Sequence, residues 1–270
     1  ILQNFKPEAV IHLAGLKAVG ESFQFPVDYY ENNVNGTIQL LRAMDSCACK
    51  IIIFSSSATV YQSQNSSINE LQSVRPPNPY GRTKYFIEEM IKDWASTDVE
   101  KSAVVLRYFN PVGAHVSGKI GEDPVSVPSN LMPVIAQVVS GRRKHLNIFG
   151  GNYDTPDGTA IRDYIHVMDL ARGHASALNY ASDNTGVEIF NLGTGIGYSV
   201  LDVVRSFETA NNLSVPFQVV GRRPGDTMMS VADTSKAQKS LGWKCQFDLV
   251  RMCQDAWRWQ SLNPFGYKTD

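Results

Sequence analysis

The sequence predicts an α/β protein with a doubly wound parallel sheet and a smaller second lobe. Short apolar runs alternate with amphipathic stretches along residues 1–111, a pattern typical of parallel strands covered by helices. The 270-residue chain, 43% hydrophobic, is long enough for one large domain with a lobe attached. Gly, Pro and polar residues become frequent after residue 111. We therefore expect a first domain over 1–111 and a mainly mixed α/β lobe over 112–270, with some segments returning to the first domain.

Periodicity and turn signals predict the elements of the first domain. The expected strands cover 9–13, 50–55 and 102–108, and the expected helices cover 28–44 and 80–94. Pro79 precedes the second helix, where the fixed φ of proline suits a first helical turn. Strand–helix repeats joined by right-handed crossovers make a sheet of the Rossmann type the simplest fold.

Composition excludes several classes of protein. The net charge of −1 provides no basic excess for a nucleic acid or an acidic membrane. No apolar run approaches the ~18 residues that a membrane helix needs. The four cysteines are scattered and lack His or Cys partners at zinc-ligand spacing. We expect a cytoplasmic protein with reduced thiols and no metal, nucleic-acid or membrane partner.

The strongest chemical signal is the YGRTK motif of residues 80–84, with Ser57 upstream at the end of a predicted strand. Tyr80 and Lys84 are four residues apart on the predicted helix and therefore point the same way. An ammonium beside a phenol favours the phenolate, and a tyrosine pKa moved from ~10 to near 7 requires roughly 4 kcal/mol. We expect Lys84 to make Tyr80 a general base and Ser57 to hydrogen-bond the same substrate oxygen.

This serine, tyrosine and lysine arrangement is that of the short-chain dehydrogenase/reductase superfamily. From about residue 7 onward, the chain resembles the extended-type UDP-glucose (UDP-galactose) 4-epimerases. The stretches that carry the resemblance are HLAGLKAVGES (12–22), NNVNGT (32–37), FSSSATVY (54–61), LRYFNPVGAH (106–115), NLMP (130–133) and RDYIHVMDL (162–170). The resemblance implies a homodimeric, NAD-dependent isomerase that interconverts UDP-galactose and UDP-glucose through a 4-keto intermediate.

The same resemblance implies how NAD is held. Tyr80 is the expected base on the sugar 4-hydroxyl, Lys84 holds the nicotinamide ribose, and Ser57 orients the reacting oxygen; all three contact NAD. The cationic nicotinamide is expected to help lower the pKa of Tyr80. The other expected NAD contacts are Leu13, Ala14, Gly15, Leu16, Lys17, Asn32 and Phe109.

The UDP-sugar site implied by the resemblance includes two arginines, which can clamp a diphosphate with forked, charge-assisted hydrogen bonds. By itself, either arginine would be interpreted as part of a surface salt bridge. The expected substrate contacts are Lys17, Ser57, Tyr80, Asn110, Asn130, Leu131, Asn147, Ile148, Phe149, Arg162, Arg223, Asp226 and Ser230.

Two departures from the family pattern are visible. The first strand, its GxxGxxG turn and the next strand–helix unit are expected before Ile1, over roughly 60–80 residues, so we expect an N-terminally truncated Rossmann sheet. The family often carries a tyrosine four residues past Asp226, where this chain has Ser230. Loss of the ring predicts that UDP-GlcNAc and UDP-GalNAc are also accepted.

Three other features have structural interpretations. His12 and His166 lie in apolar surroundings, which indicates hydrogen-bonded core histidines rather than bases. The GTGIG stretch of residues 193–197 lies between an apolar run at 188–192 and a helix predicted over 199–210. Since no acidic residue ends a second strand ~20 residues later, we interpret it as a tight turn in the substrate lobe rather than a dinucleotide site.

Two alternatives to an epimerase remain open. A nucleotide-sugar 4,6-dehydratase or decarboxylase would share the fold. In dehydratases that resemble this family, however, an Asp-Glu pair directly follows the strand-end hydroxyl residue, and here that pair is Ala58-Thr59. The second alternative is an inactive, truncated fragment that binds UDP-sugars without binding NAD.

Overall fold

The computed structural model describes residues 2–62, 66–124, 128, 130–223 and 226–267, and its first sheet has four parallel strands. In spatial order these are β1 (Ala9–His12), β2 (Ile51–Ser55), β3 (Ser102–Tyr108) and β7 (Gly186–Leu192). The three strands predicted in the first domain are confirmed to within one residue at each end. β7 pairs with β3 along its whole length, although it comes from the second half of the chain.

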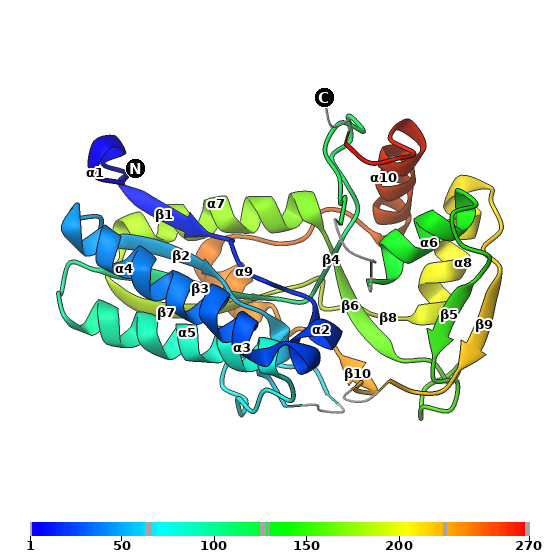
Figure 1. Ribbon diagram of the computed structural model, residues 1–270, viewed down its shortest axis with the longest axis horizontal. Coiled ribbons are helices and arrows are strands. Elements are labelled where there is room, and N and C mark those ends of the chain that lie inside the picture. The colour runs from blue at the N-terminus through cyan, green and yellow to red at the C-terminus, as the bar shows by residue number, and fades with distance from the viewer. Residues whose placement is uncertain (1, 63–65, 125–127, 129, 224–225, 268–270) are drawn as a thin grey trace.

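Helices cover both faces of this sheet (Figure 1). They are α4 (Gly36–Ser46) and α5 (Pro79–Ser96) on one face, and α7 (Val167–Asp183) and α9 (Ser235–Leu241) on the other. On β2, Ile52 and Phe54 pack toward α4 and α5, while Ile53 packs toward α7 and α9. A parallel sheet buried on both faces needs strands that are apolar on both sides, as these are. The predicted doubly wound α/β fold is confirmed.

The helix predicted over 28–44 is confirmed as a continuous helical segment, but part of it is not α-helix. It consists of α3 (Pro26–Tyr29), a π-helix η1 (Tyr30–Asn35) and then α4. A π turn holds more residues than an α turn, so the apolar spacing of an α-helix does not continue through η1. Within η1 the Asn33 carbonyl accepts a 2.7 Å hydrogen bond from the Thr37 hydroxyl, and the Asn33 side chain bonds to the loop after β1.

The second lobe is built on two small sheets. One has the strand order β10-β6-β4, with β8 antiparallel to β6, and the other pairs β5 with β9. The strands are β4 (Asn110–Val112), β5 (Leu146–Phe149), β6 (Ile161–His166), β8 (Gly197–Ser199), β9 (Phe217–Val220) and β10 (Met229–Ser230). The helices of this lobe are α6 (Leu131–Val139), α8 (Val200–Asn211) and α10 (Leu249–Leu262).

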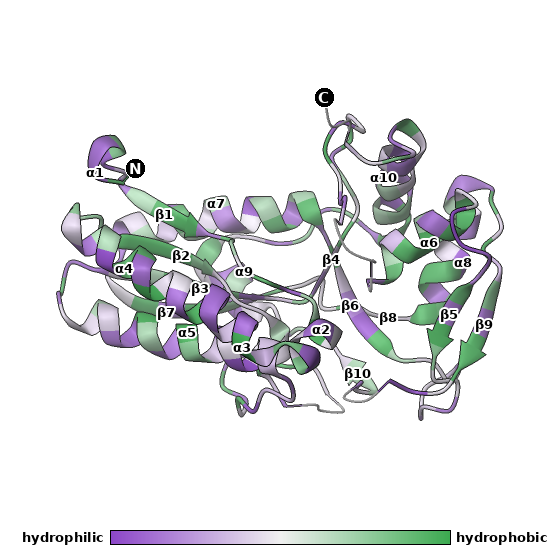
Figure 2. Ribbon diagram, viewed as in Figure 1, coloured by the Kyte–Doolittle hydropathy of each residue, from purple (hydrophilic) through white to green (hydrophobic). Residues whose placement is uncertain are grey.

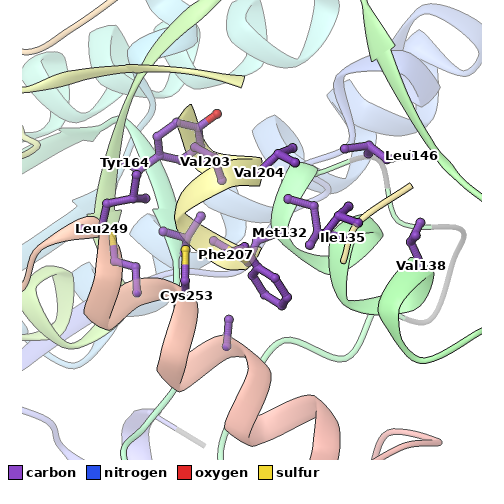
Figure 3. Packing of buried hydrophobic residues seen from close by; sticks show 14 of the residues in the cluster. Met132, Ile135, Val138, Leu146, Tyr164, Val203, Val204, Phe207, Leu249 and Cys253 are labelled. Carbon is purple, nitrogen blue, oxygen red and sulfur yellow. The ribbon is translucent and has the colours of Figure 1, made fainter. Parts of the chain in front are cut away.

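The core of the second lobe lies among these three helices and β6 (Figure 3). Phe207 of α8 is fully buried and packs in one cluster with Met132 of α6, Cys253 of α10 and Tyr164 of β6. Figure 2 shows the matching pattern of hydropathy, with apolar strands between helices that are striped apolar and polar. The second lobe therefore has a hydrophobic core of its own, and Ile165 of β6 also packs in the core of the first sheet.

Three short elements complete the fold: α1 (Leu2–Phe5), α2 (Val19–Gln24) and the 3₁₀ turn η2 (Ala58–Val60). Among the helices that the structure describes, none combines the length and apolarity required to cross a membrane. The turn η2 directly follows the carboxyl end of β2, the edge at which open α/β sheets bind their ligands.

Candidate active site

The start of α5 is fixed tightly against the end of β2. The helix begins at Pro79, as predicted, and Asn78 caps it by accepting a 2.8 Å hydrogen bond from the Gly81 N–H. A Cβ on Gly81 would lie only 2.6 Å from the Thr59 carbonyl oxygen, so only glycine permits this approach. The contact brings Tyr80 to the loop that follows β2.

Tyr80 is 7% exposed. In the protein alone, burial raises the pKa of its phenol above the ordinary value, and a hydrogen bond with Ser57 opposes the rise. The Lys84 amine lies 5.9 Å from the centroid of the Tyr80 ring and donates to the Ser55 carbonyl. Desolvation is the largest influence on the pKa of this phenol. The lower pKa expected when Lys84 and the cationic nicotinamide act together stays a prediction.

Lys84 is buried at 4% exposure, and its amine donates to the Ser55 carbonyl at 2.9 Å. Burial lowers the pKa of this amine to about 8. Among the described residues, no carboxylate lies within salt-bridge distance of it. A Cβ on Gly15 would lie 3.7 Å from the same amine and 3.0 Å from the Asn33 Oδ1, so glycine leaves an open cradle above Lys84.

The loop of predicted cofactor contacts, 13–17, is held by a residue that the sequence did not reveal. Asn33 accepts from the Leu16 N–H at 2.7 Å and donates to the Leu16 carbonyl at 3.0 Å. Its amide also donates to the Thr83 hydroxyl at 3.1 Å, which ties the loop to α5. Asn32, the predicted contact, is exposed one residue earlier. Asn32 and Asn33 differ in burial, and the sequence of two adjacent asparagines does not indicate which of them is buried.

The two arginines predicted to bind diphosphate meet at one carboxylate. Asp226 Oδ2 accepts from Arg223 Nε at 3.0 Å, and Asp226 Oδ1 lies 3.8 Å from Arg162 Nη2. The Arg223 guanidinium also lies over the Phe149 ring, 4.6 Å from its centroid. Burial lowers the pKa of Arg162, and Asp226 opposes that shift. The arrangement is a compact, positively charged cluster.

Two further predicted contacts lie on strands that flank β6 in the second sheet. Ser230 on β10 pairs in register with Arg162 on β6, and Asn110 on β4 pairs with Tyr164. Parallel pairing of β10, β6 and β4 thus places residues from three distant parts of the sequence along one edge. Ile148 differs, because its side chain is 1% exposed in the core of the second lobe.

The remaining predicted contacts lie in several places, and two of them, Lys17 and Asn130, meet at one carboxylate. Glu122, which the sequence analysis missed, accepts from Lys17 Nζ at 3.0 Å and from Asn130 Nδ2 at 3.3 Å. Asn130 precedes α6, which begins at Leu131, and Asn147 accepts a 2.8 Å bond from Gln218. Phe109 is buried in a separate cluster with Val60, Tyr61, Ile68 and Ala232. Glu122 therefore bridges residues of both lobes.

The glycine-rich turn at 193–197 binds an anion from the protein itself. Asp163 accepts from the Thr194 N–H at 2.8 Å, the Gly195 N–H at 2.9 Å and the Ala232 N–H at 3.1 Å. This supports a structural turn rather than a dinucleotide site. Its predicted place wholly within the substrate lobe is wrong, because it begins at the end of β7 in the first sheet. The turn connects the two sheets.

Both histidines interpreted as structural have hydrogen-bond partners. His12 Nε2 lies 3.0 Å from the Thr37 hydroxyl. Because that hydroxyl donates to the Asn33 carbonyl, His12 donates through Nε2. His166 is fully buried, and its Nε2 lies 3.3 Å from Asp255. These partners, Thr37 and Asp255, fit a structural role for both rings.

Comparison with known proteins places this geometry in a family. Residues 1–256 match the family model described as GDP-mannose 4,6 dehydratase. UDP-glucose 4-epimerase of Homo sapiens is 54% identical over 273 residues, which cover 100% of this chain and 78% of the relative. The UDP-glucose 4-epimerase of Bacillus subtilis is 52% identical, covering 97% of this chain and 78% of its own.

Solved structures agree with these relatives. The UDP-glucose-4-epimerase of Stenotrophomonas maltophila, with bound NAD and formylated UDP-arabinopyranose, superposes with a TM-score of 0.95 at 46% identity, covering 97% of this chain and 79% of that one. The Bifidobacterium longum enzyme, in complex with NAD+ and UDP, gives 0.92 at 48% identity, covering 96% and 78%. On sequence and on structure alike, this chain belongs to the UDP-glucose 4-epimerase family.

Proposed function

We propose that this protein is an NAD-dependent isomerase that interconverts UDP-galactose and UDP-glucose. The observation that carries the proposal is the meeting of Tyr80, Lys84 and Ser57 at the carboxyl end of β2, within a chain similar along its whole length to UDP-glucose 4-epimerases. The test is conversion of UDP-galactose to UDP-glucose by the purified protein. Absence of conversion at saturating NAD would refute the proposal.

The residues around Lys84 fit NAD. The cradle left open by Gly15 and the buried Lys84 amine suit the hydroxyls of the nicotinamide ribose, and the loop held by Asn33 lies beside them. Held there by Lys84 and the 13–17 loop, NAD would supply the hydride chemistry at the sugar C4, and its cationic ring would favour the nearby phenolate. The protein's own residues supply the proton chemistry and the orientation.

Tyr80 accepts the proton from the sugar 4-hydroxyl and later gives it back. Burial raises the pKa of the phenol, and the Ser57 hydrogen bond opposes that rise. We expect the positive charges of Lys84 and of the nicotinamide to favour the phenolate further. Ser57 is held in place because its hydroxyl oxygen accepts a 3.2 Å hydrogen bond from the Thr59 N–H. Ser57 thereby orients the oxygen that exchanges the proton.

The diphosphate of the UDP-sugar binds at the Arg162 and Arg223 cluster. Forked guanidinium groups match phosphate oxygens, and the partly buried position of Arg162 strengthens the attraction. Asp226 keeps both guanidinium groups within one small region. Asn110 and Ser230, on the flanking strands, are the proposed contacts for the sugar.

An epimerase is favoured over a dehydratase, although the matching family model is described as a GDP-mannose 4,6 dehydratase. Elimination of water across C5 and C6 requires an acid and a base near those carbons. The residues that follow Ser57 are Ala58 and Thr59, which have no group that titrates near neutral pH, and the Thr59 hydroxyl is in contact with Ser57. A stable 4-keto-6-deoxy product would argue for the dehydratase.

We further infer that the protein acts in the cytoplasm as a homodimer. All four cysteines are free thiols, which suits a reducing compartment. Phe23, Phe25, Val27 and Phe86 are 44–75% exposed on α2, α3 and α5, which contact one another. A second copy would cover this apolar face. Light scattering should give a dimer mass, and Phe86→Glu should shift it toward the monomer.

A further inference from the structure

Helix α5 presents a third residue to the segment that carries Ser57. Tyr80, Lys84 and Glu88 are spaced by four residues and share one face of the helix. Opposite them lie the consecutive serines 55–57. Lys84 donates to the Ser55 carbonyl, and the Glu88 carboxylate accepts from the Ser56 hydroxyl at 2.5 Å. Hydrogen bonds from Lys84 and Glu88 thus hold this face of α5 against the end of β2.

Glu88 is also fastened to the sheet. Arg107 of β3 donates to both Glu88 oxygens, through Nε at 3.0 Å and Nη2 at 2.5 Å. Glu88 and Arg107 are 0% and 2% exposed, and Arg107 lies 4.8 Å from the centroid of the Tyr61 ring. Glu88 therefore connects α5, strand β3 and the loop after β2 through buried hydrogen bonds.

A buried ion pair is poorly explained by stability alone. Well-packed apolar residues of similar volume often stabilise a fold as much, because desolvating two charges offsets most of their attraction. An apolar pair, however, would provide neither an acceptor for Ser56 nor a negative charge one turn from Lys84. These two properties are what the ion pair of Glu88 and Arg107 adds to the site.

We propose that Glu88 is a positioning residue for the epimerase reaction: through Ser56 it fixes the serine segment against α5, so that Ser57 meets Tyr80 and Lys84 stays beside them. The inference rests on the proposed function. Glu88 itself touches neither substrate nor cofactor.

The negative charge of Glu88 also affects Lys84, because it raises the pKa of the Lys84 amine. Burial lowers the pKa of Lys84 to about 8, and Glu88 opposes that shift. The other groups facing the amine are His12 of β1, whose own pKa is lowered by burial and by Lys84, and the phenol of Tyr80. Glu88 therefore supports the ammonium form near neutral pH.

The first test removes one hydrogen bond and leaves the ion pair. Ser56→Ala should lower kcat about 10- to 100-fold, since small misplacements of reacting groups have effects of this size. KM for UDP-galactose should stay within about twofold, because the diphosphate cluster is untouched. Ser96→Ala, at the other end of α5, is the matched control, since its hydroxyl bonds only to the Asp93 carbonyl. An unchanged kcat in Ser56→Ala would overturn the proposal.

The second test separates positioning from stability. Glu88→Leu combined with Arg107→Met should fold with a melting temperature near that of the wild type and still show a low kcat. In Glu88→Gln, the alkaline limb of the kcat profile should move down by about one pH unit, because Lys84 loses a negative neighbour. Recovery of both stability and kcat in the apolar pair would make Glu88 purely structural.

One measurement does not depend on turnover. Acetylation of Lys84 followed by mass spectrometry across pH reports the pKa of the amine directly, and Glu88→Gln should lower it by about one unit. A wild type without epimerase activity would refute the proposed function. An active wild type with the same Lys84 profile and the same kcat in Glu88→Gln would refute the role of Glu88.

Discussion

At the scale of single residues, burial governs ionisation in this site more than neighbouring charge does. Burial raises the pKa of Tyr80 and lowers that of Lys84. The sequence identified both residues, since a spacing of four on a helix places them on one face. It gave no measure of how completely the fold would exclude water from them, so their burial was not predicted. The lowering of the Tyr80 pKa by Lys84 and the nicotinamide together stays a prediction.

Replacing the proposed base should separate rate from binding. Tyr80→Phe is expected to lower kcat about 10²–10⁴-fold, the usual contribution of a general base. Affinity for UDP should be unchanged, because the arginine cluster lies on other strands. Steady-state kinetics and calorimetric titration with UDP measure the two quantities, and Tyr85→Phe on the same helix is the control. Parallel losses of rate and affinity would indicate a structural role for Tyr80.

His12 should make the protein sensitive to acid. Burial and Lys84 lower its pKa from 6.5 to about 4, so the unfolded state binds the proton first. The free energy of unfolding should therefore fall by roughly 2–3 kcal/mol as the pH drops from above 6.5 to 4. His12→Gln keeps a donor for Thr37 and should remove this component, unlike His145→Gln at an exposed position. Equal acid sensitivity in both variants would contradict the assignment.

At the scale of elements, apolar runs predicted strands well and could not reveal contacts between distant segments. β3 matches its predicted bounds because it contains a run of buried apolar residues from Ala103 to Leu106, although Arg107 in the same strand is charged and buried. The helix over 28–44 was predicted as one regular α-helix from the spacing of Val34, Ile38 and Leu41, and the π-helical turn at Tyr30–Asn35 was missed. Asn33, Glu88, Glu122 and Asp163 were missed because each has a partner that lies between 17 and 105 residues away in sequence.

The turn between β7 and β8 should depend on Asp163. Its carboxylate, fully buried, accepts from three backbone N–H groups and from the Thr194 hydroxyl. Asp163→Asn cannot accept all of these bonds, so the free energy of unfolding should fall by about 2–4 kcal/mol. Urea denaturation measures the loss, with the exposed Asp183→Asn as control. A loss below about 1 kcal/mol would mean that the turn holds its shape without the carboxylate.

The pairing of β10 with β6 places Ser230 beside Arg162, where a tyrosine is common in the family. A smaller side chain leaves space for an N-acetyl group, so we expect the wild type to convert UDP-GlcNAc and UDP-GalNAc as well. Ser230→Tyr should lower kcat/KM for the N-acetylated pair and spare the other pair. Assays with both pairs decide the matter. Failure of the wild type with the N-acetylated pair, or tolerance of it by the tyrosine variant, would exclude Ser230 as the gate.

At the scale of the whole molecule, the proposed reaction spans two sheets. The proton-transfer residues stand at the end of the first sheet, and the diphosphate cluster stands on the second. The salt bridge between Lys17 and Glu122 and the β-bridge between Ile68 and Ala232 connect the two parts. Sequence could assign residues to each part, but only the fold shows how the parts meet.

Neighbouring arginines allow a matched test of the diphosphate site. Arg223→Gln should weaken UDP binding about 10- to 100-fold, the loss expected for a charge-assisted hydrogen bond. Arg222→Gln should change affinity little, because Arg222 lies over the Tyr153 ring and bonds to Asn152. Titration with UDP compares them. Equal losses in the two variants would show general electrostatic attraction and no specific clamp.

The pairing of β7 with β3 also governs how the molecule loses its structure. β7 belongs to the second half of the chain, yet it pairs with all seven residues of β3, the strand that carries Arg107 beneath α5. Because β3 and β7 are far apart in sequence, we expect their pairing to form late in folding, after the intervening residues have folded. If unfolding of that lobe separates β7 from β3, α5 loses its contact with Arg107 of β3 in the same step. Melting should therefore be a single cooperative transition, in spite of the two lobes.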